Sequence, residues 1–373
     1  MKLFILDKID RTLLLAVAIL TLIGLVAIFS TSFNSAGTGV LNFEKQLAFT
    51  VAGIIIMLFF SFFDYRALKN YTGILYVFCC VILVSVLFFG ASVRGTASWF
   101  DLGAFNFQPS EFIKIIIIII LAKYFSRFGL QSNNLKKTIV SGIYVLVPVF
   151  MVALQPDLGS SLIIAFTWIA MLLISGIKKS HFLFIIFMAV IISGISWNFV
   201  LKDYQKDRVR TFFNSQQDLK GAGYNVNQSI IAIGSGNIWG KGLGHGSQSQ
   251  LNFLPEKHTD FIFAVIAEEM GFIGVLLVLG LFGIIFYRLL KIAEETQDNF
   301  GKFLVLGTSV LLFFHVIINI GMNMGIMPVT GIPLPFVSYG GSSMISLMIM
   351  AGIVQSVYKR GRGYKFGKEE DEV

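Results

Sequence analysis

Long apolar runs dominate this chain and limit the folds that it can adopt. Hydrophobic residues make up 55% of its 373 positions and charged residues only 13%, against about 25% in soluble domains. A run of about 20 apolar residues crosses a bilayer as a helix, because a helix satisfies its own backbone hydrogen bonds in hydrocarbon. We therefore expect an all-α polytopic membrane protein with ten spans. These are residues 12–33, 45–63, 70–90, 110–128, 138–156, 158–177, 181–201, 259–288, 302–324 and 338–358.

The basic residues predict the orientation of this bundle. Most of the 29 Lys and Arg residues flank the same ends of the predicted spans, whereas the short loops at the other ends carry only Lys45 and Arg94. Positively charged loops stay in the cytoplasm, so both termini are expected there. The net charge of +8 follows from this topology and is no evidence for nucleic acid. The first span has no small-residue cleavage site, which predicts a retained helix.

The sequence predicts a single integral membrane domain over residues 1–373. Residues 202–257 are expected to form one large extracytoplasmic loop between the seventh and eighth spans, with a short helix at Gln228–Ile233. Connections of this length are functional or disordered, and the aromatic content here favours order. Residues 361–373 are basic and then acidic, so we expect a disordered cytoplasmic tail.

Three carboxylates interrupt the eighth predicted span. A charge at the centre of a bilayer costs about 2.5–3.5 kcal/mol, so such residues pair, line water or do chemistry. Asp260 is expected just inside the outer end of the helix, either as a helix-terminal carboxylate or as a general base in a cleft. At about 100° per residue, Glu268 and Glu269 point to other neighbours than Asp260 does.

The fourth and fifth spans predict a second group of charges. Glu111 and Lys114 lie one turn apart on one helix face, ahead of a run of six isoleucines. They are open to two interpretations, a structural ion pair or a cationic site for an anionic ligand. The two spans form an antiparallel hairpin, and its outer ends should bring Asp157 near Glu111.

Several outer residues remain open between structural and functional roles. Arg94 and Trp99, in the loop before the fourth span, are either interfacial anchors or contacts for a phosphate and a sugar. The stripe of His315, Asn319 and Asn323 predicts hydrogen bonds between helices, with Glu268 or Glu269 among the possible partners. The prolines and glycines of Gly331–Ser343 predict a rigid re-entrant segment that walls a cleft. The four histidines show no metal-ligand spacing.

Four segments resemble the signatures of the SEDS family, a name that stands for shape, elongation, division and sporulation. They occur in order and in the corresponding spans, so the resemblance covers essentially the whole chain. The segments are Gln108–Lys114 (QPSEFIK), Gln155–Gly159 (QPDLG), His258–Gly271 (HTDFIFAVIAEEMG) and Gly331–Ser343 (GIPLPFVSYGGSS). Within the family, residues 98–103 and 327–333 are more similar to RodA-type than to FtsW-type members.

The resemblance implies a ten-helix bundle in the bacterial cytoplasmic membrane that polymerises peptidoglycan from lipid II at the extracytoplasmic face, for cell-wall elongation and cell shape. It implies contact with the nascent glycan strand, and a class B penicillin-binding protein as transpeptidase partner within a larger elongation complex. Asp260 matches the family's essential aspartate. Glu111, Lys114 and Asp157 match positions at which the family's function is sensitive to change.

The implied reaction suits these residues. Lipid II carries an α-linked sugar pyrophosphate and the polymer is β-linked, so a single inverting displacement needs one general base and no protein nucleophile. Asp260 would take the proton of the acceptor 4-hydroxyl. The leaving pyrophosphate needs positive charge more than an acid, and Lys114, Arg94 and Lys241 are candidates to supply it. A divalent cation, Mg²⁺ or Mn²⁺, could assist, although nothing in the sequence specifies a metal site.

Two other classes of function also fit intramembrane charges. A transporter that flips the lipid-linked precursor would use interrupted helices and buried charges, but it would bind near the midplane of the membrane. Asp260, Glu111 and Asp157 are expected at the outer face, which favours chemistry at the surface where the polymer is made. A scaffold for the partner protein would leave these charges without a use.

Overall fold

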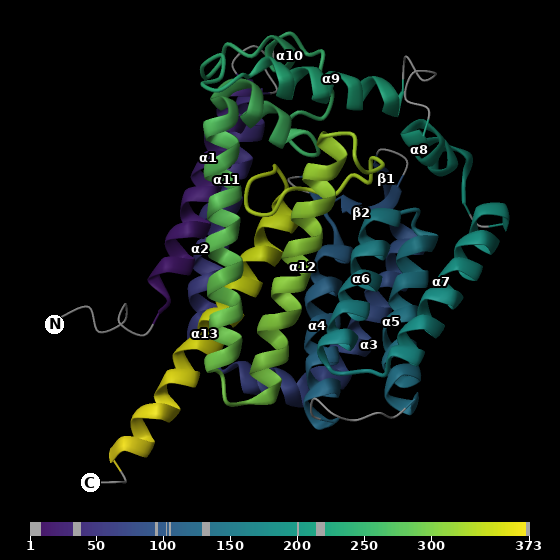
Figure 1. The fold of residues 1–373 in the computed structure, drawn as a ribbon, viewed down its shortest axis with the longest axis vertical. Coiled ribbons are helices and arrows are strands. Elements are labelled where there is room, and N and C mark those ends of the chain that lie inside the picture. The colour runs from purple at the N-terminus through teal and green to yellow at the C-terminus, as the bar shows by residue number, and fades with distance from the viewer. Residues whose placement is uncertain are drawn as a thin grey trace.

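The chain forms a bundle of long helices with a layer of short elements at one end (Figure 1). The computed structural model describes residues 9–32, 39–93, 96–101, 103, 106–128, 135–199, 201–213 and 221–370. Each predicted span coincides with one long helix, and the all-α membrane fold class is confirmed. The long helices are α1 (Arg11–Ser32), α2 (Gly39–Phe62), α3 (Tyr65–Phe89), α4 (Pro109–Phe128), α5 (Leu135–Leu154), α6 (Leu158–Ile174), α7 (Lys179–Phe199), α11 (Ile262–Glu295), α12 (Asn299–Asn323) and α13 (Gly341–Glu370).

Most of these helices have the length and composition of membrane spans. Within the described residues, eight are long and apolar enough to cross a bilayer, namely α1, α2, α3, α5, α7, α11, α12 and α13. α6 is apolar but has only 17 residues. α4 carries Glu111, Lys114, Lys123 and Arg127. Because α4 packs among α3, α6, α12 and α13, its first two charges are shared with neighbouring helices instead of facing lipid.

Short strands and helices cover one end of the bundle. β1 (Ala91–Val93), β2 (Thr96–Asp101) and β3 (Asn106–Phe107) form an antiparallel sheet in that order. Figure 1 shows α8 (Asp203–Phe213), α9 (Ala222–Ser235) and α10 (Ser247–Gln250) near the same end. The sequence predicts only a loop around Trp99, whereas the structure pairs Trp99 with Ala91 in the sheet. It also extends the predicted helix at Gln228–Ile233 to the whole of α9.

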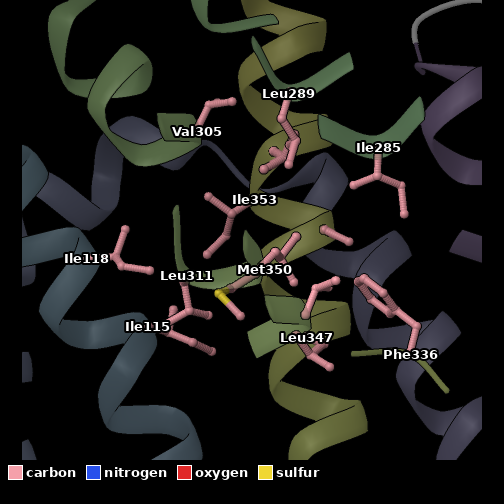
Figure 2. Close-up of a cluster of buried hydrophobic side chains, with 14 of the residues drawn as sticks. Ile115, Ile118, Ile285, Leu289, Val305, Leu311, Phe336, Leu347, Met350 and Ile353 are labelled. Carbon is pink, nitrogen blue, oxygen red and sulfur yellow. The ribbon is translucent and has the colours of Figure 1, made fainter. Parts of the chain in front are cut away.

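The centre of the bundle is formed by α12 and α13. In their most apolar stretches 67% and 83% of the residues are buried, whereas α7, at the margin of the bundle in Figure 1, has no buried residue. Figure 2 shows side chains from four helices meeting at this centre, among them Ile118, Leu289, Leu311 and Met350. Apolar side chains are solvated by lipid tails about as well as by protein, so the exposed face of α7 fits a membrane environment.

The chain between α12 and α13 is irregular but buried. Its Ile332, Leu334, Phe336 and Val337 are each at most 3% exposed. α1 approaches it at Gly24, where a Cβ would lie 2.4 Å from the carbonyl oxygen of Val337, so only glycine allows this contact. The segment therefore has the re-entrant character that the sequence predicts. Its irregular backbone packs against protein, which is the condition for such backbone among membrane helices.

α13 extends further than the sequence predicts. It continues to Glu370, so the structure gives helical backbone to most of residues 361–373, for which the sequence predicts disorder. Figure 1 shows this last part projecting from the bundle at the end opposite α8, α9 and α10. Residues 371–373 lie outside the described chain.

Candidate functional site

Asp260 lies in the turns that precede α11, at the end of the bundle covered by the sheet and α9. Helix α11 begins at Ile262, so Asp260 is outside it, and the predicted position inside the helix is wrong. The helix N-cap is Phe261, which makes no side-chain cap. Asp260 is partly exposed, and its carboxylate faces the irregular segment: a Cβ placed on Gly331 would lie 3.7 Å from Oδ2.

Two asparagines of α12 hold the main chain of Asp260. The side-chain amides of Asn319 and Asn323 donate hydrogen bonds to the Asp260 carbonyl oxygen, at 3.1 and 2.9 Å. Asn319 also donates to the carbonyl of Ile332 at 2.8 Å. Both asparagines are fully buried, and hydrogen bonds among buried groups are costly to break. The turn with Asp260 and the segment with Gly331 are therefore fixed to the same helix.

Asn323 also caps α11 from outside that helix. Its Oδ1 accepts a hydrogen bond at 3.2 Å from the backbone N–H of Ala264 in the first turn, and this N–H also donates to the Phe261 carbonyl at 3.1 Å. The hydroxyl of Ser229 in α9 donates to the Asn323 carbonyl at 2.8 Å. The polar stripe of α12 thus makes the inter-element hydrogen bonds that the sequence predicts. Its asparagines bond to the Asp260 turn and not to Glu268 or Glu269.

His258 connects the turn to α1 and to the end of the irregular segment. Its Nδ1 lies 2.9 Å from the Thr31 hydroxyl, and its carbonyl accepts a hydrogen bond from the Tyr339 N–H at 2.8 Å. Burial, aided by the charge of Lys257, lowers the pKa of His258 to about 4, so the imidazole is neutral at pH 7. Burial also lowers the pKa of Lys257, whose Nζ donates to the Ser249 carbonyl at 2.7 Å.

Asp157 joins the start of α6 to the start of α4. As the N-cap of α6 it accepts a hydrogen bond from Ser160 N–H at 3.0 Å. Its other oxygen accepts from the amide of Gln108 and the hydroxyl of Ser110, both at 3.2 Å. Ser110 immediately precedes Glu111, so the predicted proximity of the two helix ends is present. Because Asp157 is only partly buried, it lies at the surface of this end.

Glu111 and Lys114 form a buried ion pair inside the bundle. The two residues are 4% and 2% exposed, and the Lys114 Nζ lies 2.7 Å from Glu111 Oε1. The same Nζ lies 3.2 Å from His315 Nε2, and Ser346 donates to the other oxygen of Glu111 at 3.4 Å. His315 Nδ1 is 3.4 Å from the Pro333 carbonyl. The pair is therefore connected through His315 to the irregular segment, which the Asp260 carboxylate faces.

Glu268 and Glu269 fasten α10 and the loop between α9 and α10 to α11. Glu268 pairs with Lys241 at 3.0 Å and accepts hydrogen bonds from the N–H groups of Gln248 and Ser249, at 2.9 and 3.1 Å. Glu269 accepts hydrogen bonds from the Ser30 hydroxyl at 2.7 Å, from the Gln250 side-chain amide and from the Gly244 N–H. These contacts explain the two glutamates structurally. Lys241, the predicted pyrophosphate contact, is thereby held next to the Glu268 carboxylate. The Lys241 side chain is 29% exposed.

The same loop supplies the backbone partners at a break in α11. Gly271 has φ +66° and ψ −163°, a conformation that interrupts the helix and is open only to glycine. The N–H groups of Phe272 and Ile273 donate to the loop carbonyls of Asn237 and Ile238, at 2.9 and 3.3 Å. In the other direction, the loop N–H of Lys241 donates to the Glu268 carbonyl at 3.0 Å. Loop and helix therefore complete each other's hydrogen bonding.

The structure also shows a cation near the site that sequence reasoning missed. Arg208 of α8 donates a hydrogen bond to the Val329 carbonyl at 3.4 Å, and it lines a cavity of about 70 Å³ with Phe212, Ile230 and Pro328. The amphipathic sequence of α8 was the available signal. Among the predicted contacts, Trp99 is partly exposed in β2, while Arg94 lies outside the described residues.

The described residues show no metal centre. In the described ranges, no group of three or more His, Cys, Asp or Glu side chains is arranged to hold an ion. The described acidic residues of the site have other partners: Asp157 is bound by Gln108 and Ser110, and Glu111 by Lys114 and Ser346.

The fold and this site define a polytopic membrane protein with a polar, carboxylate-bearing site at one end of its helical bundle. The family model for the cell cycle proteins FtsW, RodA and SpoVE matches residues 10–362. The chain belongs to this family, which confirms the predicted resemblance. It is 40% identical to the peptidoglycan glycosyltransferase MrdB of Escherichia coli K12 over 354 residues, covering 94% of each chain.

Solved structures share the fold over nearly the whole chain. One is a chain of a peptidoglycan synthase complex, in a study of how polymerization and crosslinking are coordinated; it has a TM-score of 0.80 and 29% identity, with 95% of this chain and 98% of that chain covered. Another is the rod shape determining protein RodA of Thermus thermophilus, with a TM-score of 0.70 and 27% identity, covering 94% and 96%. The architecture is thus common to family members of modest identity.

Proposed function

We propose that this chain is a peptidoglycan glycosyltransferase that polymerises lipid II by an inverting displacement, with Asp260 as the general base. The activity itself is supported by the name of the MrdB relative, of which the chain covers 94%. The role of Asp260 rests on one structural observation. Its main chain is fixed by Asn319 and Asn323, while its partly exposed carboxylate faces the irregular segment at the bundle end.

The proposed step balances as a single substitution. The Asp260 carboxylate takes the proton of the acceptor 4-hydroxyl while that oxygen attacks the anomeric carbon of the donor. The bond between this carbon and the lipid pyrophosphate breaks, and the pyrophosphate leaves with the bonding electrons. A base in a fixed position needs no reorganisation at the moment of reaction, and well-placed general bases contribute about 10²–10⁴-fold.

The neighbouring residues fit binding roles in this scheme. Arg208 and Lys241 are cations of the outer layer, the part of the chain formed by the sheet, α8, α9, α10 and their loops. Arg94 is predicted in the same region. These three residues would stabilise negative charge on the pyrophosphate. Trp99 would contact a sugar ring. Asp157 would orient a sugar hydroxyl, and the buried Glu111–Lys114 pair would act through His315 on the backbone of the irregular segment. Any Mg²⁺ or Mn²⁺ would add charge at the pyrophosphate.

A transpeptidase partner follows from the same proposal. The likeness to a chain from a peptidoglycan synthase complex supports assembly with a protein that crosslinks the new strands. We propose a class B penicillin-binding protein in that role, placed so that strands leave the outer end of this bundle. The protein is then a multi-pass protein of the bacterial cytoplasmic membrane with its active site at the extracytoplasmic face.

The decisive experiment measures polymer formation by the purified protein from lipid II, with and without a transpeptidase partner. Asp260→Asn keeps the size of the side chain and removes the base, so we expect polymerisation to fall by about 10²–10⁴-fold while lipid II still binds. The matched control is Asp207→Asn on α8, an exposed carboxylate of the same outer layer, which should leave the rate unchanged.

Two results would contradict the proposal. A folded Asp260→Asn protein that polymerises at the wild-type rate would exclude the general-base role. A wild-type protein that moves lipid II across vesicle membranes without making polymer, even with the partner present, would favour the transporter instead. Thermal unfolding of both variants shows whether a loss of rate comes from a loss of fold.

A further inference from the structure

A second polar cavity lies at the opposite end of the bundle from Asp260. It has a volume of about 220 Å³ and is formed where the start of α3, the end of α4 and the first half of α5 meet. Figure 1 shows these three helices side by side at that end. Basic residues predict this end to be cytoplasmic. The lining consists of Thr72, Gly73, Tyr76, Ile120, Lys123, Tyr124, Arg127 and Tyr144.

The charge of this cavity is entirely positive. Its lining contains Lys123 and Arg127 and no carboxylate, and neither cation is in an ion pair within the described chain. The nearby charges are also positive, because Lys69 and Arg127 both act electrostatically on Lys123. The adjoining residues 129–134 contain no Asp or Glu. Like charges held together without a counter-ion attract an anion.

Some other basic residues of the same bundle end have partners. Arg288 is paired with Asp10, Arg360 with Asp64, and the Nζ of Lys137 donates to the Ser175 carbonyl at 3.0 Å. A neighbouring cavity at this end is also lined by cations, namely Arg66, Lys69 and Arg360, but its lining includes the carboxylate of Asp298, whereas the cavity with Lys123 and Arg127 has none. The cavity therefore differs from the ordinary positive flank of a membrane span.

The polar groups beside the cations suit a phosphate. The Thr72 hydroxyl accepts a hydrogen bond from Lys123 Nζ at 2.5 Å, which holds the ammonium at the cavity wall. Three tyrosines surround the space, with the ring centroids of Tyr76 and Tyr144 5.6 Å apart and those of Tyr124 and Tyr144 6.1 Å apart. Phenol groups at membrane–water interfaces present an apolar ring and a hydrogen-bonding hydroxyl to lipid headgroups.

Apolar surface continues from the cavity along the bundle. Val77 of α3 follows Tyr76 and is 61% exposed; Ile143 and Val147 of α5 flank Tyr144 and are 56% and 42% exposed. These side chains offer a path for acyl chains directly beside the charged cavity. A free anion would use the cations alone, whereas a lipid would use the cations and this apolar surface together.

We propose that this cavity binds the phosphate headgroup of an anionic phospholipid from the adjacent leaflet. Lys123 and Arg127 contact the phosphate, the tyrosines contact the headgroup, and the acyl chains lie along the exposed faces of α3 and α5. Basic pockets between membrane helices at the cytoplasmic side are suited to such headgroups. The site is separate from the proposed glycosyltransferase chemistry and does not depend on it.

The test uses the full-length protein in a neutral detergent with dioctanoyl phosphatidylglycerol as the probe. We expect the lipid to raise the thermal unfolding midpoint in a saturable manner. Arg127→Gln and Lys123→Gln should each weaken the apparent affinity at least about tenfold, because each removes a charge-assisted contact. Arg127→Lys should restore part of the binding. The matched control Lys291→Gln, which removes a cation of α11 outside the cavity lining, should bind as the wild type does.

Three further arms identify the source of the phosphate. Dioctanoyl phosphatidylcholine, which carries no net charge, should stabilise the protein less than phosphatidylglycerol does. Inorganic phosphate and glycerol phosphate should have little effect at the same concentration. Equal stabilisation by the two lipids, or by phosphate alone, would overturn the lipid site. Unchanged affinity in Arg127→Gln would do the same; because Arg127 is exposed, this variant keeps the fold even if Lys123→Gln does not.

Discussion

At the scale of single residues, Asn323 has the widest influence on the proposed site. Its side chain is fully buried, donates to the Asp260 carbonyl at 2.9 Å and accepts from the Ala264 N–H at 3.2 Å. One amide thus positions the turn that holds Asp260 and caps the helix that follows it. An apolar residue of similar size would remove one of two hydrogen bonds at each partner: the Asp260 carbonyl would keep its bond from Asn319, and the Ala264 N–H would keep its bond to the Phe261 carbonyl.

Substitution of Asn323 by leucine tests this positioning role. We expect Asn323→Leu to lower the free energy of unfolding by about 1–3 kcal/mol, since it removes one hydrogen bond from each of two buried groups. The polymerisation rate per folded molecule should also fall, because the Asp260 turn loses a support. Asn198→Leu on α7 is the control: that exposed asparagine makes only one bond, to the Gly194 carbonyl, and its loss should change neither quantity. Equal rates in the two variants would contradict the positioning role.

His258 predicts a dependence of stability on pH. Its pKa is lowered from 6.5 to about 4 by burial and by Lys257, so the unfolded chain binds a proton more readily than the folded one. Stability from this group is therefore complete above pH 6.5 and decreases as the pH falls toward 4, by about 1.4 kcal/mol per unit at most. At pH 5 we expect a loss of about 1–2 kcal/mol.

Thermal unfolding at pH 7 and pH 5 measures this effect. His258→Gln keeps a hydrogen-bonding side chain near Thr31 but cannot titrate, so its loss of stability between the two pH values should be smaller than that of the wild type. His181→Gln is the control, because His181 lies in α7, which has no buried residue, and this variant should behave as the wild type does. Identical pH dependence in all three proteins would exclude His258 as the source.

At the scale of elements, α11 depends on one glycine. A Cβ on Gly271 would lie 2.3 Å from the N atom of Gly240 and 2.6 Å from the carbonyl oxygen of Ile238, and its φ of +66° disfavours every other residue. Gly271→Ala should therefore lower the free energy of unfolding by about 2–4 kcal/mol. Gly280→Ala, on the same helix with no atom within 4 Å of the added Cβ, should be neutral or stabilise by up to about 1 kcal/mol. Chemical or thermal unfolding of the two variants compares them directly.

The long helices could be predicted from the sequence because each rests on a local run of apolar residues. The start of α11 could not be predicted in this way, since hydropathy does not show that residues 255–261 form turns. Asp260 is therefore not part of the helix, and the comparison of its direction with those of Glu268 and Glu269 at about 100° per residue does not apply. The separation of Asp260 from Glu268 and Glu269 is nevertheless correct, for another reason: those glutamates bind α10 and the loop before it.

The candidate site was predictable only where its contacts are local. Glu111 and Lys114 are three residues apart, and their pairing follows from helix geometry. The contacts of Asn319 and Asn323 with Asp260 join residues 59 and 63 positions apart, and no pattern in the sequence names such partners. The contact of Arg208 could not be predicted for the same reason, because its hydrogen-bond partner Val329 lies 121 positions away.

At the scale of the whole molecule, a buried ion pair joins the start of α1 to α11 and α13. Asp10, ahead of α1, accepts hydrogen bonds from Arg288 of α11, and its backbone exchanges two bonds with the Gln355 side chain of α13, at 2.8 and 3.1 Å. The Asp10 side chain is 1% exposed, so it cannot turn to water if its partner is removed. This junction lies far from Asp260 along α11.

Loss of this junction should affect stability without affecting chemistry. Arg288→Leu leaves a buried carboxylate unpaired, and we expect the free energy of unfolding to fall by about 3–5 kcal/mol while the polymerisation rate per folded molecule stays the same. Arg210→Leu breaks the pair with Asp207, whose side chains are 64% and 61% exposed, and should cost about 0–1 kcal/mol. Unfolding midpoints and rates of both variants are the measurements; a greater loss in Arg210→Leu would contradict the argument.

The break at Gly271 has a consequence for how this protein opens. The N–H groups of Phe272 and Ile273, after the break, donate to loop carbonyls, and the loop N–H of Lys241 donates to the Glu268 carbonyl before the break. These amide hydrogens can therefore exchange with solvent only when the loop and the helix separate. The outer layer and the membrane bundle therefore form one cooperative unit at this point. We therefore expect any opening of the loop to remove hydrogen bonds from α11 as well, so that the two open together.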